Sequence, residues 1–370
     1  MPLYLTSLTL AGLGDWVRRP GTDGPVILID NASRELGDQE AIVGLAIGKL
    51  REQGIAVRRI DVLADGPDAL DPAAAIVITG GDPFRLLDDL RTSGADAALL
   101  DAHARGIPIA GQSAGAIVCG PSLQPIRITS PFRPPAGLDL GGLNLTEHVI
   151  LPHQDRPGRA ALHRQAALRF GGMLPLTALW DDEALLIAQD GWTIVRGGQR
   201  TRTAAPADAE AVAEVFHQAA QHAWSAFLGE DRLAAANRDA ASWSQRIAQG
   251  GHRFLITEDH QGPAGFVWYH QAASTGAEPP AGEVDMLYTH PRVWGTGTGR
   301  RLLERATWNL LCEGFREALL WTEARNERAL AVYRQGGWTQ DGAVDERRYL
   351  GVPIRNLRHR LDLTRHAGGA

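Results

Sequence analysis

The chain has 370 residues, of which 44% are hydrophobic and 22% charged, a composition typical of a folded globular protein with room for two domains. Its formal net charge of -6 offers no basic surface, so we expect no nucleic-acid partner. The two cysteines, Cys119 and Cys312, lack the spacing of a disulfide framework or a zinc site, which favours a reducing cytoplasm and no bound metal.

No stretch of the sequence approaches the ~20 apolar residues of a membrane-spanning helix, so we expect no membrane association. The segment 3–13 is mildly apolar, but Thr6, Ser7 and Thr9 interrupt it and no basic region precedes it. This pattern argues against a signal peptide.

The first half of the chain alternates short apolar runs with helical patterns. Strands are predicted at Val26–Ile29, Ile55–Val62, Ala74–Thr79, Ile107–Ala110, His148–Leu151, Ala184–Ala188 and Trp192–Val195, and a helix at Gln39–Gln53. Strand–helix–strand order predicts a parallel sheet covered on both faces.

The character of the sequence changes at about residues 196–202, where a Gly-Gly pair precedes an Arg/Thr-rich stretch. Asp208 is then predicted to cap a helix, because Val212, Val215, Phe216 and Ala219 recur at helical spacing. Strands follow at 254–257 and 265–270. We therefore predict two domains, residues 1–198 and 199–370.

The segment 107–116 reads as a buried strand that turns directly into a helix of small residues. Gly111 and Gly115 flank Ser113 in the pattern G-x-S-x-G, typical of a nucleophile elbow. Small neighbours allow a tight turn that exposes the Ser113 hydroxyl, and the Ala114 amide then faces a developing oxyanion. The alternative interpretation is a glycine-rich turn without chemistry.

Two further segments favour a serine hydrolase. Gly80 and Gly81 follow another predicted parallel strand, where a Gly-Gly turn offers a second amide to the same oxyanion. His153 lies just beyond a predicted strand and is a candidate to deprotonate Ser113, although an isolated histidine there is more often structural.

In order and spacing, the segments Gly80–Phe84, Gly111–Ala116 and Leu151–Asp155 resemble the peptidase E and cyanophycinase family. The resemblance covers about residues 1–197. It implies an α/β fold of the glutamine-amidotransferase-like α/β/α sandwich type with a mostly parallel sheet, acting on a small peptide or amide.

The resemblance also implies roles for single residues. Ser113 would be the nucleophile and His153 the base, and the amides of Gly81 and Ala114 would bind the oxyanion. For the third member of the triad Asp181 aligns best, with Asp182 and Glu183 as neighbouring alternatives. Alternation along a strand would place Asp181 and Glu183 on one face.

The sequence departs from peptidase E at two positions that border the substrate. Asp82 stands where that enzyme has Asn, and Gln112 replaces the bulkier or hydroxylated residue that precedes the nucleophile. We therefore expect a peptide or amide bond in general, and dipeptides that begin with Asp are only one candidate.

A second strand–loop–helix unit follows in the C-terminal half. A strand over 283–291 leads into a loop that contains Gly295, Gly297 and Gly299, and a helix over Arg300–Glu313 follows. Unpaired amides at such a helix start bind phosphate, and glycines allow its close approach. The G-x-G-x-G spacing does not fit the dinucleotide fingerprint, and Arg300 stands where a Walker loop needs lysine.

The pattern Arg292-x-x-Gly295-x-Gly297 instead matches the acetyl-CoA motif of GNAT acetyltransferases. The segment Asn326–Trp338 resembles the helix and turn that this family carries further along the chain, with Trp338 as its aromatic residue. The resemblance covers about residues 200–365. It implies a mixed α/β fold, acetyl-CoA as co-substrate and a small amine as acceptor.

By this resemblance several residues would hold the co-substrate. The pantetheine arm would pair with strand amides from Leu287, Tyr288 and Thr289, and the pyrophosphate would lie within the segment from Arg292 to Arg300. Asn326 would contact the arm, and Tyr333 would donate a proton to the departing thiolate, unless it is only a core residue.

The acceptor amine must lose a proton before it attacks the thioester. Glu283 is the first candidate for this base and Asp285 the second, and their two-residue spacing predicts that both lie on one face of a strand. Trp224, Phe227 and Trp243 lie in the helical region that roofs the acceptor pocket in this family. They either recognise an apolar or aromatic acceptor or belong to the core.

Three interpretations of the whole chain remain open at this point. In the first, a hydrolase frees an amine that the acetyltransferase caps, or both domains inactivate one amide-containing compound. In the second, the N-terminal domain is a non-catalytic binding or scaffold module, against which the presence of Ser113 and His153 argues. In the third, the N-terminal domain is a glutaminase, but such an enzyme would be expected to have Cys as its nucleophile, and residue 113 is Ser. A homodimer is compatible with all three.

Overall fold

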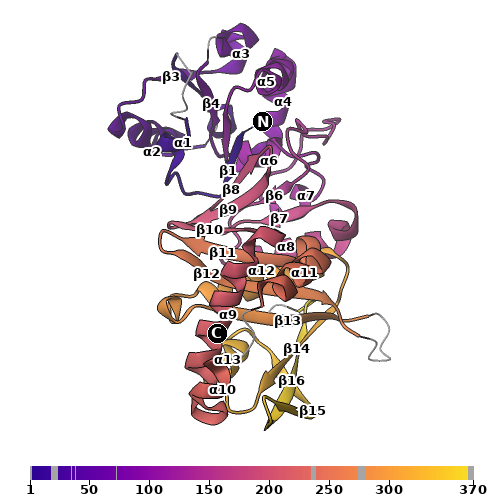
Figure 1. Ribbon diagram of the computed structural model, residues 1–370. Coiled ribbons are helices and arrows are strands. Elements are labelled where there is room, and N and C mark those ends of the chain that lie inside the picture. Colours follow the sequence, from indigo (N-terminus) through magenta and orange to yellow (C-terminus); the bar gives the residue numbers. More distant parts are fainter. Residues whose placement is uncertain are drawn as a thin grey trace. The chain divides into compact units, whose positions relative to one another are not determined.

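A computed structural model describes residues 2–17, 24–34, 36–37, 39–71, 73–234, 239–273 and 280–365 (Figure 1). The chain forms two compact units, Met1–Gly197 and Gly198–Ala370. Both units combine β-strands in sheets with helices on the sheet faces, which confirms the predicted α/β class. None of the helices in the described ranges has the length and apolar character needed to cross a membrane.

The sheet of the N-terminal unit has a parallel centre and an antiparallel side. Its strands are, in spatial order, β9 (Gly191–Arg196), β8 (Glu183–Ala188), β1 (Leu3–Thr6), β5 (Ile109–Gln112), β4 (Ala75–Ile78), β2 (Val26–Ile29) and β3 (Val57–Ile60). From β1 to β3 all neighbours are parallel, whereas β8 runs antiparallel to both β1 and β9. A separate parallel pair joins β6 (Val149–Leu151) to β7 (Leu176–Ala178).

Helices cover both faces of this sheet. They are α1 (Leu13–Val17), α2 (Gln39–Glu52), α3 (Val62–Asp65), α4 (Pro83–Ser93), α5 (Ala95–Ala104), α6 (Ala114–Val118), α7 (Ile126–Thr129) and α8 (Arg159–Phe170). Tyr4, Leu28 and Val77 pack with α1 and α2 on one face, and α6 packs against β4 and β5. Strands buried on both faces need continuous apolar sequence, which is why β2 and β4 were predictable.

One strand of this unit is shorter than expected, and another had not been predicted. The strand expected over Ile55–Val62 ends at Ile60, because Asp61 caps helix α3 by accepting a hydrogen bond from the Leu63 amide. Leu3–Thr6, considered above only as a mildly apolar segment, is the buried strand β1 between β5 and β8. Four residues that include a Thr gave no periodic signal strong enough to identify it.

The C-terminal unit has a mixed sheet whose strands follow one another mostly as antiparallel neighbours. In spatial order they are β15 (Thr339–Tyr349), β16 (Val352–Asp362), β14 (Glu317–Glu323), β13 (Gly282–Thr289), β12 (Gly262–Gln271), β11 (Phe254–Asp259) and β10 (Gln199–Thr203). Strands β13 and β14 run parallel to each other, and the other neighbouring strands described here are antiparallel.

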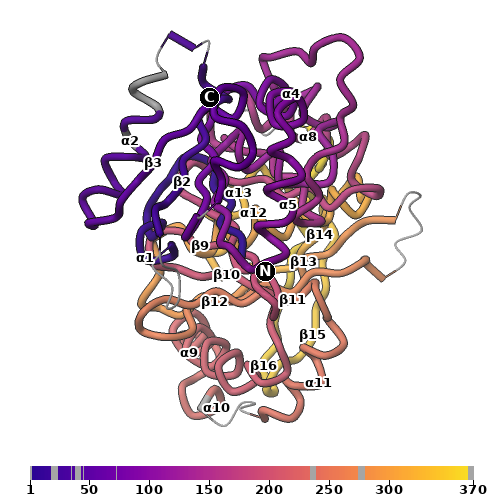
Figure 2. The backbone as a smooth tube through the Cα atoms, turned by 90° about the horizontal axis from the view of Figure 1, so that it is seen from above, coloured from indigo at the N-terminus to yellow at the C-terminus, as the bar shows by residue number. Residues whose placement is uncertain are grey.

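Helices also cover this second sheet. They are α9 (Ala209–Leu228), α10 (Glu230–Ala234), α11 (Ala240–Gly250), α12 (Thr298–Cys312) and α13 (Glu327–Gln335). Helices α9 and α11 pack against each other and share an apolar cluster with β11 and β12 that includes Val212, Trp243 and Phe266. Figure 2 shows α9 beside β12. Helix α12 packs against β12 and β13, where Leu302 closely approaches Gly265.

Two irregularities of β13 shape the space beside it. Its pairing with β12 shifts between Trp268↔Met286 and Tyr269↔Val284, so Asp285 is the extra residue of a β-bulge. On its other edge β13 pairs with β14 only at Gly282 and Glu283. The two parallel strands therefore separate beyond Glu283 and leave the later part of that edge of β13 without a strand partner.

Candidate active sites

Ser113 lies between β5 and α6 in a backbone conformation that side chains rarely adopt, with φ 49° and ψ −106°. Only glycine fits two residues before Ser113 and two residues after it. A Cβ atom on Gly115 would lie 2.2 Å from the Ile78 carbonyl oxygen, and one on Gly111 would lie 2.5 Å from the Gly115 carbonyl carbon. The G-x-S-x-G pattern therefore produces a tight strand-to-helix turn, as a nucleophile elbow requires.

His153 and Asp181 lie in line with the Ser113 hydroxyl. Ser113 Oγ is 3.0 Å from His153 Nε2, and His153 Nδ1 is 2.5 Å from Asp181 Oδ1. The two acidic neighbours of Asp181 have other contacts. Asp182 is paired with Arg196 at 2.5 Å, and buried Glu183 accepts a hydrogen bond from the Trp180 amide.

Asp181 lies in the turn before β8 and not within a strand, so the alternation argument for Asp181 and Glu183 does not apply. Arg156 donates a hydrogen bond from Nε to Asp181 Oδ2 at 2.7 Å, and the Asp155 side chain accepts one from the Asp181 amide. These contacts fix the carboxylate so that its other oxygen faces the imidazole.

Ser7 is a polar residue of this site that sequence reasoning missed. It is fully buried just beyond β1, accepts a hydrogen bond from the His153 amide at 2.7 Å and donates one to Asp181 Oδ1 at 2.8 Å. Its hydroxyl also lies 3.2 Å from His153 Nδ1. No motif marks Ser7, and only recognition of β1 as the strand beside β5 would have brought it near Ser113.

The electrostatics of the site favour a neutral imidazole beside an ionised carboxylate. Burial lowers the pKa of His153 below its ordinary value, although the hydrogen bond and charge of Asp181 act in the opposite direction. Burial acts to raise the pKa of Asp181, but hydrogen bonds from His153, Arg156 and Ser7 outweigh it and lower that pKa. Such a pair suits a general base with its orienting acid.

The Gly80–Gly81 turn and the start of α6 border the Ser113 side chain. A Cβ atom on Gly80 would be 3.7 Å from Ser113 Oγ, so the Gly80–Gly81 turn runs beside it. Gly81 has φ 142°, and a Cβ there would lie 2.0 Å from the Ala32 carbonyl oxygen. Within the described ranges, the amides of Gly81 and Ala114 donate to no backbone carbonyl.

The two positions that depart from peptidase E both make structural contacts. Asp82 caps α4, because its Oδ1 accepts hydrogen bonds from the amides of Phe84 and Arg85. Gln112 donates from Nε2 to the Leu8 carbonyl at 2.9 Å, whereas its buried Oε1 has no hydrogen-bond partner among the described residues.

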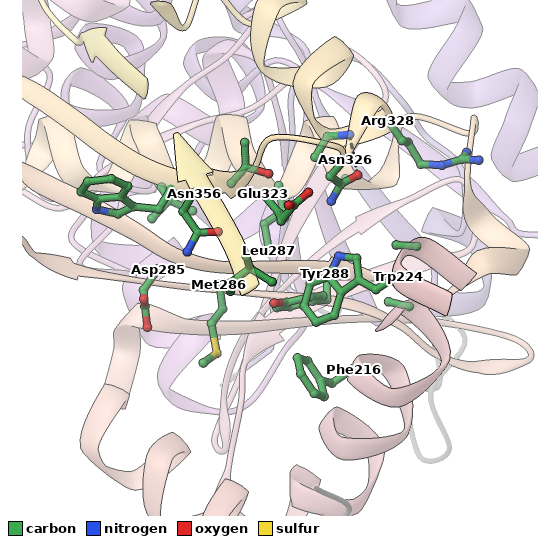
Figure 3. A pocket seen from close by; sticks show the side chains of 18 of the residues that line it. Phe216, Trp224, Asp285, Met286, Leu287, Tyr288, Glu323, Asn326, Arg328 and Asn356 are labelled. Carbon is green, nitrogen blue, oxygen red and sulfur yellow. Dashed lines mark hydrogen bonds between the residues drawn. The ribbon is translucent and has the colours of Figure 1, made fainter. Parts of the chain in front are cut away.

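The C-terminal unit contains a cavity of about 850 Å³, a size typical of small-molecule sites. Strand β13 lines it along 283–289, and residues of β14, β15, β16, α9, α11 and α13 also line it. Figure 3 shows Phe216 and Trp224 beside Tyr288, with Glu323 and Asn326 across the opening from them. The separation of β13 from β14 opens this cavity.

Leu287, Tyr288 and Thr289 all line the cavity. They pair with β12 on one edge and lie beyond the last β13–β14 pair on the other. Their backbone is therefore a strand edge to which an extended ligand can add, as a further strand would. Burial raises the pKa of the Tyr288 phenol above its ordinary value.

The glycine loop ends at a helix start with open donors. Helix α12 begins at Thr298, two residues earlier than expected, and Gly295 and Gly297 have φ 81° and 88°. Within the part of the chain that the structure describes, the amides of residues 297–300 donate to no backbone carbonyl. Gly299 lines the cavity, so these donors lie at its border.

The two arginines of the loop are engaged elsewhere. The Arg292 guanidinium pairs with Asp259 at 2.5 Å and donates to the carbonyls of Gly262 and Pro263, so it ties the loop to the β11–β12 turn. Arg300 is 56% exposed and lies 3.5 Å from Glu304 on the helix surface. Both guanidinium groups therefore contact other parts of the protein.

Asn326 and Tyr333 both line the cavity from α13. Asn326 caps that helix, because its Oδ1 accepts a hydrogen bond from the Ala329 amide at 3.2 Å. Tyr333 is 8% exposed, and burial raises its pKa to about 12. A phenol of this kind keeps its proton at neutral pH and can donate it.

Glu283 and Asp285 line the same cavity, although the bulge at Asp285 breaks the alternation on which their common face was predicted. Burial raises the pKa of Glu283 above its ordinary value, and the charge of Asp285 acts in the same direction. His270 pairs with Glu283 across the strands, and its Nε2 lies 4.0 Å from Asp285 Oδ2.

Trp224, Phe227 and Trp243 also line the cavity, from α9 and α11. Trp243 is 4% exposed and packs against Phe216 and Phe266, so it belongs to the core as well.

We also searched the described residues for side chains that could bind a metal ion together. In the described ranges, no group of three or more His, Cys, Asp or Glu side chains could hold a metal ion.

Comparison with protein families assigns the two units separately. Residues 21–195 match peptidase family S51, and residues 216–337 match the acetyltransferase (GNAT) family. The match to S51 contains Ser113, His153 and Asp181, and the match to GNAT contains the glycine loop and Tyr333.

Individual relatives follow the same division. Peptidase E of Streptomyces coelicolor is 33% identical over 129 residues, which are 35% of this chain and 52% of that protein. A mycothiol acetyltransferase of Beutenbergia cavernae is 28% identical over 211 residues, which are 50% of this chain and 62% of that protein. A solved structure of a putative peptidase E from Listeria monocytogenes is 22% identical, covers 53% of this chain and 98% of its own, and has a TM-score of 0.46.

The chain thus spans about half to two thirds of the length of these two sequence relatives. Motif spacing, family matches and relatives agree on both units. The chain joins an N-terminal domain of peptidase family S51 to a C-terminal domain of the GNAT acetyltransferase family.

Proposed function

We propose that the chain is a bifunctional enzyme, whose residues 1–198 hydrolyse a small peptide or amide and whose residues 199–370 transfer an acetyl group to a small amine. The observation that carries the hydrolase is the line of contacts from Ser113 through His153 to Asp181. The observation that carries the acetyltransferase is a set of open amides at the border of a cavity along a free strand edge.

In the hydrolase, His153 takes the proton of the Ser113 hydroxyl as Oγ attacks the scissile carbonyl. The amides of Gly81 and Ala114 bind the resulting oxyanion. His153 then gives its proton to the departing amine, and water releases the acyl group from Ser113 by the same route in reverse. Asp181 holds the imidazole and stabilises its charged form.

A fluorophosphonate probe tests this assignment directly, because it labels an activated serine. We expect the wild-type chain to be labelled at Ser113, and labelling to be lost in both Ser113→Ala and His153→Ala. Wild-type protein that remains unlabelled would instead support a binding or scaffold role for the N-terminal domain. A panel of dipeptides with different first residues then examines the positions next to Asp82 and Gln112.

For the acetyltransferase, the open amides of residues 297–300 fit a pyrophosphate, and the unpaired edge at Leu287–Thr289 fits an extended pantetheine arm. Acetyl-CoA would supply an activated acyl group there. Glu283 receives the proton of the acceptor amine, directly or through water, with Asp285 as the alternative. Tyr333 donates a proton to the thiolate, and Asn326 borders the arm.

Acetyl-CoA binding, measured by titration calorimetry, tests the loop. Gly297→Glu puts a negative charge where the pyrophosphate lies, but Gly297 also has φ 88°, so this substitution strains the backbone. Gly299→Glu avoids that strain, since a Cβ at Gly299 meets nothing closer than 3.6 Å. We expect both variants to lose binding. Unchanged affinity in folded Gly299→Glu would refute the loop assignment.

Two features bear on where the enzyme works. Cys119 and Cys312 are both free thiols, and burial raises the pKa of each to about 12. Unreactive free thiols suit a reducing compartment, so we place the enzyme in the cytoplasm.

A further inference from the structure

Charges of both signs line the cavity of the C-terminal unit, and some of them pair with each other, as Arg347 does with Asp345. Glu283 and Asp285 lie on β13, and Arg246 lies on α11. The ion pairs of the described residues join neither acid to Arg246. Charges that face one cavity and do not neutralise each other are available to a ligand.

Arg246 is held in place by aromatic rings and not by a carboxylate. Its guanidinium carbon lies 5.5 Å from the centre of the Trp243 ring and 6.0 Å from that of Trp268. Among the described residues it has neither an ion pair nor a hydrogen bond, whereas Arg292 and Arg325 of the same unit are paired. Its planar set of N–H donors matches the geometry of a carboxylate.

Two acidic side chains of β13 belong to the same lining. Asp285 is 37% exposed at the bulge, which interrupts the alternation of the strand. Glu283 is partly buried two residues earlier. His270 lies beside Asp285 but outside the cavity lining. Two carboxylates close together in a cavity lining attract an ammonium group.

An apolar wall lies in the same cavity. Phe216 packs edge-on against Tyr288 with ring centres 4.9 Å apart, and Trp224 lies 6.1 Å from Tyr288. Met286 extends from β13 near this group (Figure 3). Aromatic and thioether groups of this kind accept an apolar side chain of varied shape.

We propose that the acetyl acceptor is a zwitterion, namely an apolar amino acid or a short apolar peptide with a free amino end and a free carboxylate. The ammonium group lies toward Glu283 and Asp285, the carboxylate pairs with Arg246, and the side chain lies against Phe216 and Trp224. This inference rests on the proposed acetyl transfer. It also names the class of reaction that supplies the acceptor, because hydrolysis of a peptide bond releases such molecules.

The proton and bond changes balance at these residues. The ammonium gives one proton to the carboxylate of Glu283, and the neutral amine then attacks the acetyl carbonyl. A C–N bond forms and the C–S bond breaks. Tyr333 donates its proton to the thiolate, and the nitrogen of the adduct returns its second proton to the phenolate through water. Glu283 gives the first proton to solvent, so one proton is released for each amide formed, and the carboxylate of the product is unchanged.

The test uses the full chain and acetyl-CoA, with release of free thiol as the readout. The acceptors are phenylalanine, the dipeptide Leu-Phe, phenylalaninamide and phenethylamine. We expect kcat/KM for phenylalanine or Leu-Phe to exceed that for the two carboxylate-free amines by about tenfold or more, the effect of one charge-assisted pair. Arg246→Gln should raise KM for the zwitterion and bring that ratio to about one, and Arg246→Lys should restore part of it.

Arg316→Gln is the matched control, since it removes one exposed arginine outside the cavity and should keep the ratio. Equal rates for all four acceptors, or a ratio that Arg246→Gln leaves intact, overturns the zwitterion proposal. Acetyl-CoA binding without acetylation of any acceptor overturns it too. Absence of acetyl-CoA binding by the wild-type chain overturns the proposed transferase itself, so the two failures are distinguishable.

Discussion

Ser113 and His153 share an unusual property, since both are non-glycine residues with positive φ, 49° and 68°. Such conformations cost of order 1–3 kcal/mol each and persist only where surrounding contacts enforce them. The end of β1 supplies those contacts. The Thr6 carbonyl accepts the Ser113 amide at 2.9 Å, and the Ser7 hydroxyl accepts the His153 amide. One short strand therefore orients both members of the pair.

Removing the Ser7 hydroxyl should lower the labelling rate of Ser113 by about tenfold, or ~1.4 kcal/mol of activation free energy. The His153 amide would lose its acceptor and Asp181 would lose one of its donors. The Asp181 carboxylate then becomes a stronger partner of the imidazolium, so the acid limb of the rate profile of Ser7→Ala should move to higher pH. Fluorophosphonate labelling across pH measures both effects.

Ser93→Ala is a suitable control, because it also removes a part-buried hydroxyl that bonds a backbone carbonyl, at the end of α4. It should label at the wild-type rate. If Ser7→Ala loses thermal stability but keeps the wild-type rate and pH profile, Ser7 is a packing residue only.

The pH dependence of the wild-type hydrolase follows from His153. General-base catalysis needs the neutral imidazole, so the rate rises with pH through the pKa of His153 and then levels off. Because burial lowers that pKa, the midpoint of the rise should lie below about 6.5, the ordinary value for histidine. The second-order labelling rate of Ser113 from pH 4 to 8 measures it. A midpoint clearly above the ordinary value would show that Asp181 outweighs burial.

At the scale of helices and strands, the sequence predicted those features that depend on residues adjacent in the chain. The strand-to-helix turn at Ser113 and the helix start after Gly297 depend on residues adjacent in the chain, and both could be predicted. The bulge at Asp285 and the early separation of β13 from β14 arise from pairing between strands. No pattern within β13 encodes them. The same reason hid the contacts of Ser7, which lies 146 residues from His153.

Arg292 illustrates the difference between a motif and its mechanism. The motif suggested a phosphate ligand, but the guanidinium joins the loop to Asp259 and to two carbonyls of the β11–β12 turn. Its side chain is 21% exposed and that of Asp259 12%. We therefore propose that Arg292 acts through the loop, by keeping the open amides at the start of α12 in place.

Arg292→Ala should lower the free energy of unfolding by about 2 kcal/mol, since it leaves a largely buried carboxylate and two carbonyls without their donor. Arg300→Ala should change it by less than about 0.5 kcal/mol, because that side chain is exposed. Denaturant unfolding measures both. An Arg292→Ala variant that keeps wild-type stability but loses acetyl-CoA affinity would instead identify the guanidinium as a direct ligand.

At the scale of the whole molecule, each unit holds a complete set of the residues assigned to its reaction. Ser113, His153 and Asp181 all precede Gly197, and every residue that lines the large cavity follows Gly198. The two sites also use the same physical device, backbone amides at the start of a helix directed at negative charge. We infer that the two activities are chemically independent and that any coupling between them operates through a shared compound.

This inference gives a test with separable outcomes. Ser113→Ala should lower the rate of hydrolysis roughly a thousandfold or more but leave the rate of acetylation of a free amine within about twofold. Gly299→Glu should abolish acetylation but leave the rate of hydrolysis within about twofold. With a peptide whose amino end is blocked, acetylated product should form only when both sites are intact, because Ser113 must first expose the amine. Mass spectrometry of the products distinguishes these cases. If Ser113→Ala also stops acetylation of the free amine, the units are not independent. If the wild-type chain hydrolyses and acetylates only unrelated compounds, the domains share a chain but not a substrate.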